Sequence, residues 1–404
     1  MTAELEDAVA SVAPSVVGWR RQFHQHPELA YQERATSQVV EHELRKLDLD
    51  VMRPGLGSTG VAALLKGTGP APRGDSALLL RADMDALPIN EETGLSFASA
   101  TQGVMHACGH DAHTAILLGV AKVLSGLRGR LATDVLFMFQ PAEEIGSGAR
   151  RMLDDGLFDI ARPDAAYMLH VWHDLDAGTV AIPTGPVMAG ALTFKIEVNG
   201  RGGHAARPHL ALDPVVASAE IVTTLQLLVS REVDPAQPTV VTIGSVRAGD
   251  AANVIPMSAT LLGTARSYDL GVLSFLERRI TEIASQIARA LRLSAEVRFD
   301  TVVPPVVNDI TSARLATQAI TAELGPTAVG IVGPSMGSED FANVLQQVPG
   351  AMIRLGVRSP ATSAAAPIHT SMFNLDESAL RVGVTALCAI ALHRNQAAES
   401  IEKA

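Results

Sequence analysis

Residues 77–82 read Ala-Leu-Leu-Leu-Arg-Ala, an apolar run bounded by Gly and Asp on one side and by Leu-Pro on the other. Such a run is typical of a strand that is buried on both faces of a sheet. Similar runs follow at 133–139 and 165–170, and a helical pattern extends from His110 to about Leu127. Strands that alternate with helices predict an α/β domain, in which helices flank a mostly parallel central sheet.

The pattern changes near residue 185. Residues 192–198 alternate strictly between apolar and polar side chains, which predicts a strand covered on one face only. Further strands are expected at 239–246, 258–266 and 295–299, and helices at 213–231 and 271–292. The resulting order, β-α-β-β-α-β, is that of a ferredoxin-like α+β sandwich. We therefore predict a discontinuous α/β domain, 1–184 and 301–404, with a small domain inserted at 185–300.

Composition excludes several classes of protein. The 404 residues include 32 basic and 43 acidic side chains, a net charge of −11, whereas nucleic-acid binding favours a basic stripe. No apolar run reaches the roughly 18 residues of a membrane span. The amino-terminal residues are acidic where a secretory signal would be basic, and two cysteines cannot form a disulfide framework. We expect a cytoplasmic enzyme that binds neither nucleic acid nor membrane.

The densest group of potential metal ligands is Met105-His-Ala-Cys-Gly-His-Asp-Ala-His-Thr. Cys108 and His110 are two residues apart in a glycine-containing loop that enters a helix, so both side chains can face one point. Thiolate and imidazole suit zinc and similar divalent ions. The alternative interpretation is a polar helix start that carries surface histidines.

Three further candidates lie elsewhere in the chain. Glu143 and Glu144 follow a predicted strand, where open α/β sheets build their sites, although an acid-rich helix start is an alternative. Adjacent carboxylates on a loop can diverge, so that one binds a metal while the other takes a proton. His170 closes the run 165–170 at the same sheet edge, or is a satisfied core histidine. His369, in Pro367-Ile-His-Thr, is uninformative alone.

Together these segments offer more donors than one metal ion needs. The donors are Cys108, His110, Glu144, His170 and His369. Five are too many for one tetrahedral zinc that keeps an open position, but they suit two metals that share a water or a carboxylate. Such metals lower the pKa of water and polarise a carbonyl, while a free carboxylate shuttles the proton. The set therefore indicates a hydrolase.

Seven motifs, which follow one another along the chain, give the sequence a resemblance to a known family. They are Arg81-Ala-Asp-Met-Asp-Ala-Leu-Pro, His106-Ala-Cys-Gly-His-Asp-Ala-His-Thr, Gln140-Pro-Ala-Glu-Glu, Gly202-Gly-His-Ala-Ala-Arg-Pro-His, Asn253-Val-Ile-Pro, Gly337-Ser-Glu-Asp-Phe and Pro367-Ile-His-Thr. The chain resembles the di-metal amidohydrolases of the aminoacylase/carboxypeptidase type. The most similar branch contains hippurate hydrolases, indoleacetyl-amino-acid hydrolases and N-acetyl-diaminopimelate deacetylases.

The resemblance implies a zinc-peptidase-like catalytic domain in which the five donors bind two divalent ions of Zn, Mn, Co or Ni. It also implies that Glu143 is the general base and then the acid that protonates the leaving amine. Asp83 would lie behind the ligands and orient them. The broader family has a metal-binding His two residues before that Asp. Arg81 stands there in this sequence, and the resemblance to this branch implies that Cys108 and His110 bind metal in place of that His.

The inserted domain resembles the family's dimerisation or lid domain, so we expect a homodimer. The resemblance implies that His204, after the turn Asn199-Gly-Arg-Gly-Gly, stabilises the oxyanion of the substrate, often across the dimer. Asn253 would assist substrate binding, and Arg266 would pair with the substrate's carboxylate. The alternatives are a turn that only shapes the backbone and, for Arg266, a solvated strand-edge charge.

The predicted reaction is hydrolysis of the amide bond of an N-acyl amino acid, or of a small dipeptide-like substrate, to a carboxylate and an amino acid. One alternative is a thiol hydrolase with Cys108 as nucleophile, which leaves Glu143, Glu144 and His369 unexplained. The other is a non-catalytic metal-binding protein on the same fold. The sequence leaves the acyl group and the native metal open.

Overall fold

The computed structural model describes residues 2–70, 77–359 and 366–401. The chain forms two compact units. The first comprises 1–185, 307–333 and 340–404, and the second comprises 186–306 and 334–339. The predicted boundaries, with an inserted domain at 185–300, differ from this division at two places.

The first difference is that the predicted boundary at residue 300 falls inside a strand, β13 (Ser294–Val303). The second is that residues 334–339, which the sequence pattern places in the catalytic domain, form part of the second unit. There Ser335 donates its N–H to Val187 O at 2.9 Å and accepts from Ala189 N–H at 3.0 Å. No periodicity in the sequence indicates this short return of the chain.

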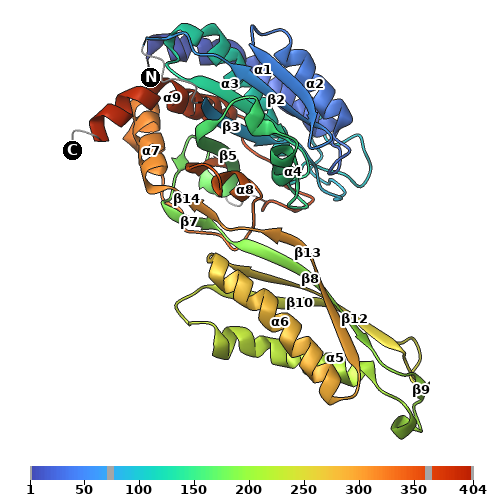
Figure 1. Ribbon diagram of the computed structural model, residues 1–404. Coiled ribbons are helices and arrows are strands. Elements are labelled where there is room, and N and C mark those ends of the chain that lie inside the picture. Colours follow the sequence, from blue (N-terminus) through green and yellow to red (C-terminus); the bar gives the residue numbers. More distant parts are fainter. Residues whose placement is uncertain (1, 71–76, 360–365, 402–404) are drawn as a thin grey trace. The chain divides into compact units, whose positions relative to one another are not determined.

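The described residues of the first unit contain a seven-stranded sheet of order β1-β2-β4-β3-β5-β15-β6 (Figure 1). The pairs β4–β3, β3–β5 and β5–β15 are parallel, and the outer pairs are antiparallel. The mostly parallel sheet is therefore confirmed. The strands are β1 (Val51–Leu56), β2 (Gly60–Leu65), β3 (Ala77–Asp83), β4 (Asp134–Gln140), β5 (Pro163–Asp176), β6 (Val180–Ala181) and β15 (Gly350–Arg358).

Helices of the first unit bury the sheet. They are α1 (Ala3–Gln25), α2 (Arg34–Leu44), α3 (His110–Gly126), α4 (Gly148–Asp154), α7 (Ile310–Leu324), α8 (Ala342–Leu345) and α9 (Ser378–Ile401). In Figure 1, α1, α3 and α9 lie together, and their apolar residues share one core with the strands. Helix α3 is buried along nearly its whole length, which is why its polar residues concentrate in the first turn. No helix among the described residues has the length and apolar character needed to cross a membrane.

The second unit has the predicted ferredoxin-like order. Its main elements are β8 (Gly190–Asn199), α5 (Pro214–Leu227), β10 (Thr239–Arg247), β12 (Ser258–Ser267), α6 (Leu270–Ala290) and β13. The antiparallel sheet has the order β10-β12-β8-β13, and alternate residues of β8 point into a core formed with the two helices. The Asp213 carboxylate accepts from Val215 N–H at 2.8 Å, with Pro214 in the first position, so α5 begins where the sequence predicts. Its short strands are β7 (Gly185–Met188), β9 (Gly203–His204) and β11 (Val254–Ile255), and β14 (Val306–Asn308) begins at the last residue of the contiguous segment 186–306.

Candidate metal centre

The predicted site residues of the first unit lie at the carboxyl edge of the parallel strands. Asp83 ends β3, and Glu143 and Glu144 lie in the loop that follows β4. Arg81 is in register with Met168 of β5, which places Asp83 level with His170. This is the edge at which open α/β sheets build sites, because loops leave the strands there in different directions.

Two groups of three donor atoms meet at Cys108. Cys108, His110 and His170 form one group, and Cys108, Glu144 and His369 form the other; within each, the donor atoms lie within 4.8 Å of one another. Cys108 Sγ is 3.5 Å from His170 Nε2 and 3.3 Å from His369 Nε2. Two ligands of one tetrahedral ion lie about 3.4 Å apart when each bond is near 2.1 Å. The five predicted ligands are therefore brought together in two overlapping groups, and the distances from Cys108 to His170 and to His369 match the spacing of two donors to one ion.

Glu144 faces both parts of this cluster. Its Oε1 is 3.8 Å from His110 Nε2, and its Oε2 is 3.7 Å from His369 Nε2. Glu143 lies beside it, with Oε2 at 3.9 Å from His110 Nε2. The adjacent carboxylates thus occupy different positions around the same imidazole, as the loop following β4 suggests.

Hydrogen bonds distinguish the histidines that can bind a metal. His170 Nδ1 donates to Val171 O at 2.7 Å, which leaves the Nε2 lone pair directed at Cys108. In His113, Nε2 accepts from Val171 N–H at 2.9 Å and Nδ1 donates to Asp83 Oδ1 at 2.6 Å. Both ring nitrogens of His113 are occupied, so this residue braces Asp83 and Val171 and is not a ligand.

Orphaned polar atoms show that the cluster suits a cation. His110 Nδ1 and Nε2 and Glu144 Oε1 are buried, and no described residue forms a hydrogen bond with them. Leaving such groups unsatisfied costs about 1–3 kcal/mol each, and more for charged groups. A cation held by His110 and Glu144 would compensate Nε2 and Oε1, and Asp85 Oδ1 lies 3.3 Å from Nδ1.

Burial and crowded carboxylates shift the protonation of these donors. Burial, together with Glu144, raises the pKa of the Cys108 thiol. Burial and the nearby carboxylates of Asp85 and Asp83 raise the pKa of Glu144 to about 7, against the opposing effect of His110. Burial lowers the pKa of His170. A divalent cation would favour the thiolate, the carboxylate and the neutral imidazole, so its binding would release protons.

The loop that carries Glu143 and Glu144 is held by its backbone. Three consecutive N–H groups donate to buried carboxylates: Ala142 to Glu33 Oε1 at 2.9 Å, Glu143 to Asp85 Oδ1 at 3.0 Å and Glu144 to Asp85 Oδ2 at 3.0 Å. Ala142 has a φ of 53°, a left-handed conformation that a non-glycine residue adopts rarely. The carboxylates of Glu33 and Asp85 therefore fix the loop in an uncommon geometry.

Sequence reasoning did not identify Glu33, Asp85 or His113. Asp85 stands two residues after Asp83, and that spacing is a signal that it serves the same edge; Glu33 has no comparable signal. Asp83 itself lies 3.6 Å from His110 Nε2 and accepts from Arg81 Nη1 at 2.6 Å. Burial would raise the pKa of Asp83, but Arg81 and the two histidines hold it well below the ordinary value.

The other three predicted residues belong to the second unit. His204, in β9, is in register with Val254 of β11, and the carbonyl of Asn253 accepts from Ala205 N–H at 3.0 Å. His204 and Asn253 thus share one short ladder. Arg266 lies on β12, between β10 and β8, and its Nη1 donates to Met336 O at 2.9 Å. Arg266 is half-buried near the end of β12, which is an interior strand of this sheet.

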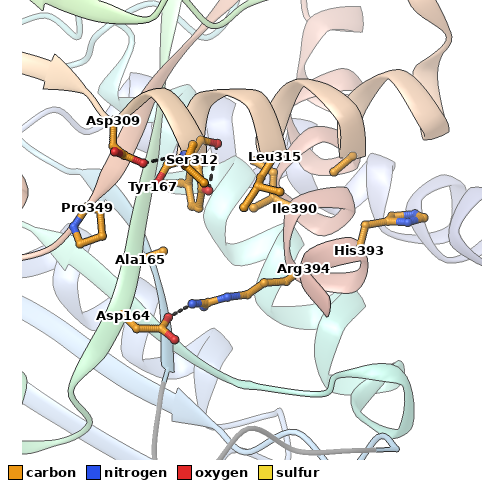
Figure 2. Close-up of a pocket in the computed structure, with 12 residues that line it drawn as sticks. Asp164, Ala165, Tyr167, Asp309, Ser312, Leu315, Pro349, Ile390, His393 and Arg394 are labelled. Carbon is orange, nitrogen blue, oxygen red and sulfur yellow. Dashed lines mark hydrogen bonds and ion pairs between the residues drawn. The ribbon is translucent and has the colours of Figure 1, made fainter. Parts of the chain in front are cut away.

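A separate cavity of about 360 Å³ opens at the opposite edge of the same sheet, between α7, α9 and the start of β5 (Figure 2). Its charged groups already have partners. Arg394 pairs with Asp164, and Asp309 caps α7 by accepting from Ser312 N–H at 2.7 Å. None of the groups of three possible metal donors found among the described residues lies there. The carboxyl edge is therefore the better candidate for the functional site.

A cluster of thiol, imidazole and carboxylate donors at this edge, beside an anchored second carboxylate, defines a metal-dependent hydrolase. The chain belongs to the peptidase family M20/M25/M40, whose model matches residues 79–393. It is 38% identical over 372 residues to N-acetyl-L-cysteine deacetylase of Bacillus subtilis, which covers 92% of this chain and 86% of the relative. It is also 38% identical over 374 residues to IAA-amino acid hydrolase ILR1-like 4 of Arabidopsis thaliana, which covers 92% and 83%.

A solved structure supports the same assignment. The Bacillus subtilis YXEP protein, described as a dinuclear metal binding peptidase of the M20 family, superimposes with a TM-score of 0.80 at 33% identity. The match covers 96% of this chain and 99% of that one. The resemblance drawn from the seven motifs is confirmed, and the chain is a hydrolase of this family.

Proposed function

We propose that this protein hydrolyses the amide bond of an N-acyl amino acid and releases a carboxylate and an amino acid. The observation that carries the proposal is the pair of donor groups that meet at Cys108 with Glu143 beside them. The named activities of the relatives, a deacetylase of N-acetylcysteine and a hydrolase of IAA-amino acids, support this substrate class.

Two divalent ions of Zn, Mn, Co or Ni would be held by the donors Cys108, His110, Glu144, His170 and His369. When bound, they would polarise the substrate carbonyl and acidify water. Glu143 would take the proton from the attacking water as the new C–O bond forms. It would then give this proton to the nitrogen as the C–N bond breaks, so that an amine leaves. The hydrogen bond from Glu143 N–H to Asp85 anchors the loop that presents this carboxylate.

The second unit would contribute substrate contacts. We assign stabilisation of the oxyanion to His204, whose exposed side chain follows a glycine-rich turn. Asn253 would assist binding, and Arg266 would pair with the carboxylate of the amino-acid portion; the half-buried guanidinium suits this role, because desolvation strengthens charge pairing. The open edges of β10 and β13 favour a homodimer through this unit. Both cysteines are free thiols, which fits a reducing cytoplasm.

The alternative of a thiol hydrolase is disfavoured by Cys108 itself. A nucleophilic cysteine is partly exposed and has a lowered pKa. The Cys108 side chain is buried, and burial raises the pKa of its thiol. Full activity after chelation, with loss of metal verified, would restore this alternative.

The experiment combines metal content with a substrate panel. Elemental mass spectrometry of the purified protein is expected to find about two divalent ions per chain. Acetyl, benzoyl, indoleacetyl and succinyl amino acids are then tested for release of the free amine. Glu143→Gln is expected to retain both ions and to lose about 10²–10⁴-fold in kcat. A fully metallated protein that hydrolyses no member of the panel, or an equally active Glu143→Gln variant, would refute the proposal.

A further inference from the structure

A cluster of buried charges lies behind the metal centre and is not explained by the proposed chemistry. Arg20 and His24 come from α1, and Asp111 comes from the first turn of α3; each is at most 1% exposed. Asp111 Oδ2 accepts from Arg20 Nε at 2.9 Å and from His24 Nδ1 at 2.8 Å. Asp111 directly follows the proposed ligand His110, so these contacts fix the start of the helix that presents it.

The second nitrogen of His24 reaches another carboxylate. His24 Nε2 is 3.2 Å from Glu91 Oε1, and the Glu91 side chain is only 4% exposed. Both ring nitrogens therefore face carboxylates, an arrangement in which a doubly protonated imidazolium donates twice. Burial alone would lower the pKa of His24, but Asp111 and Glu91 raise it to about 9. His24 is a buried cation that joins two segments distant in sequence.

The residue after Glu91 forms hydrogen bonds with the segment that carries the proposed ligand His369. Glu92 donates its N–H to Ser371 O at 2.9 Å, and Ser371 Oγ donates to the Glu92 carboxylate at 2.5 Å. Ser371 stands two residues after the proposed ligand His369. His369 has a φ of 62° and a side chain that is 51% exposed, and its own N–H donates to Ala107 O at 2.7 Å. Among the described residues, the bonds of His369 to Ala107 and of Ser371 to Glu92 hold the segment that carries this half-exposed proposed ligand.

We infer that His24 is a positioning residue: bridging Asp111 and Glu91, it holds the ligand segments 108–111 and 369–371 in place before metal binds. We call Arg20, His24, Glu91 and Asp111 the His24 bridge. The inference rests on the proposed ligand set. Its physical basis is preorganisation, because ligands already held in binding geometry lose less conformational freedom when the ion arrives.

The test measures metal affinity separately from activity. In His24→Asn, the shorter amide can still donate to Asp111 but cannot reach Glu91. The probe is Co²⁺, titrated into chelator-stripped protein in competition with a metal-binding dye at fixed pH. Loss of a group that orients ligands typically weakens binding 10–100-fold, and we expect this change for at least one of the two ions.

The matched control is His393→Asn. His393 Nε2 lies 2.5 Å from Oε1 of the buried Glu323 in the same unit, and both residues lie in helices that carry no proposed ligand. This variant removes another histidine–carboxylate contact, and we expect it to lower the unfolding temperature and leave Co²⁺ affinity unchanged. Equal Co²⁺ affinity in His24→Asn and the parent would overturn the inference, whatever the change in stability.

A second variant keeps the inference testable if His24→Asn does not fold. Glu91→Gln retains an acceptor for His24 and removes one charge, and a 2–10-fold loss of Co²⁺ affinity is expected, about 0.4–1.4 kcal/mol. Unchanged affinity in a folded Glu91→Gln variant would contradict the role of the bridge. A parent protein that binds no Co²⁺ would refute the proposed ligand set itself, and this outcome is seen before any variant is compared.

Discussion

Raising the pH from 6 to 10 should destabilise the first unit because His24 loses its proton. The pKa of His24 is raised from 6.5 to about 9 in the folded protein. A raised pKa means that the folded state binds the proton more tightly, so the contribution is complete below pH 6.5 and disappears as the pH passes about 9. One pKa unit corresponds to about 1.4 kcal/mol, which gives about 3 kcal/mol for this shift. That is a large share of the 5–15 kcal/mol by which typical domains are stable.

The assay is urea unfolding at pH 6, 7.5, 9 and 10 in the presence of a chelator, so that metal binding does not contribute. Trp19 and Trp172 are the two tryptophans of the chain, and both lie in the first unit, so their fluorescence reports the unit that contains His24. His24→Asn serves as the reference, because it cannot titrate at this position. Tyr167, whose pKa is raised to about 12 by burial, stays neutral throughout.

The measured quantity is the difference in free energy of unfolding between the parent and His24→Asn. It should fall by about 3 kcal/mol between pH 6 and pH 10. The carboxylates of Asp111 and Glu91 have lowered pKa values, that of Glu91 about 2, so both stay ionised and add no slope in this range. A difference that is constant from pH 6 to pH 10 would refute the view that folded His24 is a cation.

Two further predictions concern the loop that enters α3. Cys108→Ser should lower the metal content below two ions per chain, measured by elemental mass spectrometry, because Cys108 belongs to both donor groups; retention of both ions would contradict the ligand assignment. Gly109→Ala should cost about 1–3 kcal/mol in urea unfolding, since Gly109 has a φ of 87° and an added Cβ would lie 2.5 Å from Val171 Cγ2. Gly126→Ala, where an added Cβ meets nothing within 4 Å, is the control and should be neutral or stabilising by about 0.5–1 kcal/mol; equal effects at the two glycines would refute the reasoning.

Much of the fold follows from periodicity, because burial acts on every residue of an element. The strict alternation of 192–198 predicts a half-covered strand, and β8 has this form. Residue type likewise indicates the five proposed donors, since few functions other than metal binding need thiol, imidazole and carboxylate side chains together. Both kinds of signal repeat or cluster along the sequence, which is why they can be recognised without a structure.

Contacts between single, distant residues leave no such pattern. The hydrogen bond from Ala142 N–H to Glu33 joins residues 109 positions apart, and nothing near Glu33 predicts it. His110 and His113 lie on one helix three residues apart and look equivalent in the sequence. They differ in their hydrogen bonds, because His113 Nε2 accepts from Val171 N–H and His113 Nδ1 donates to Asp83, whereas neither ring nitrogen of His110 is bonded to a described residue.

The strand order of the first unit also determines how long one of its strands waits for its partner during translation. β5 ends at Asp176, but its neighbour β15 begins only at Gly350, after the whole contiguous segment 186–306 of the second unit has been made. At 5–20 residues per second this takes roughly 10–30 s, during which a largely apolar strand on the nascent chain has one open edge. Such an edge can recruit other chains. We therefore expect the yield of native protein from translation to depend more on temperature and chaperone supply than on the stability of the finished molecule.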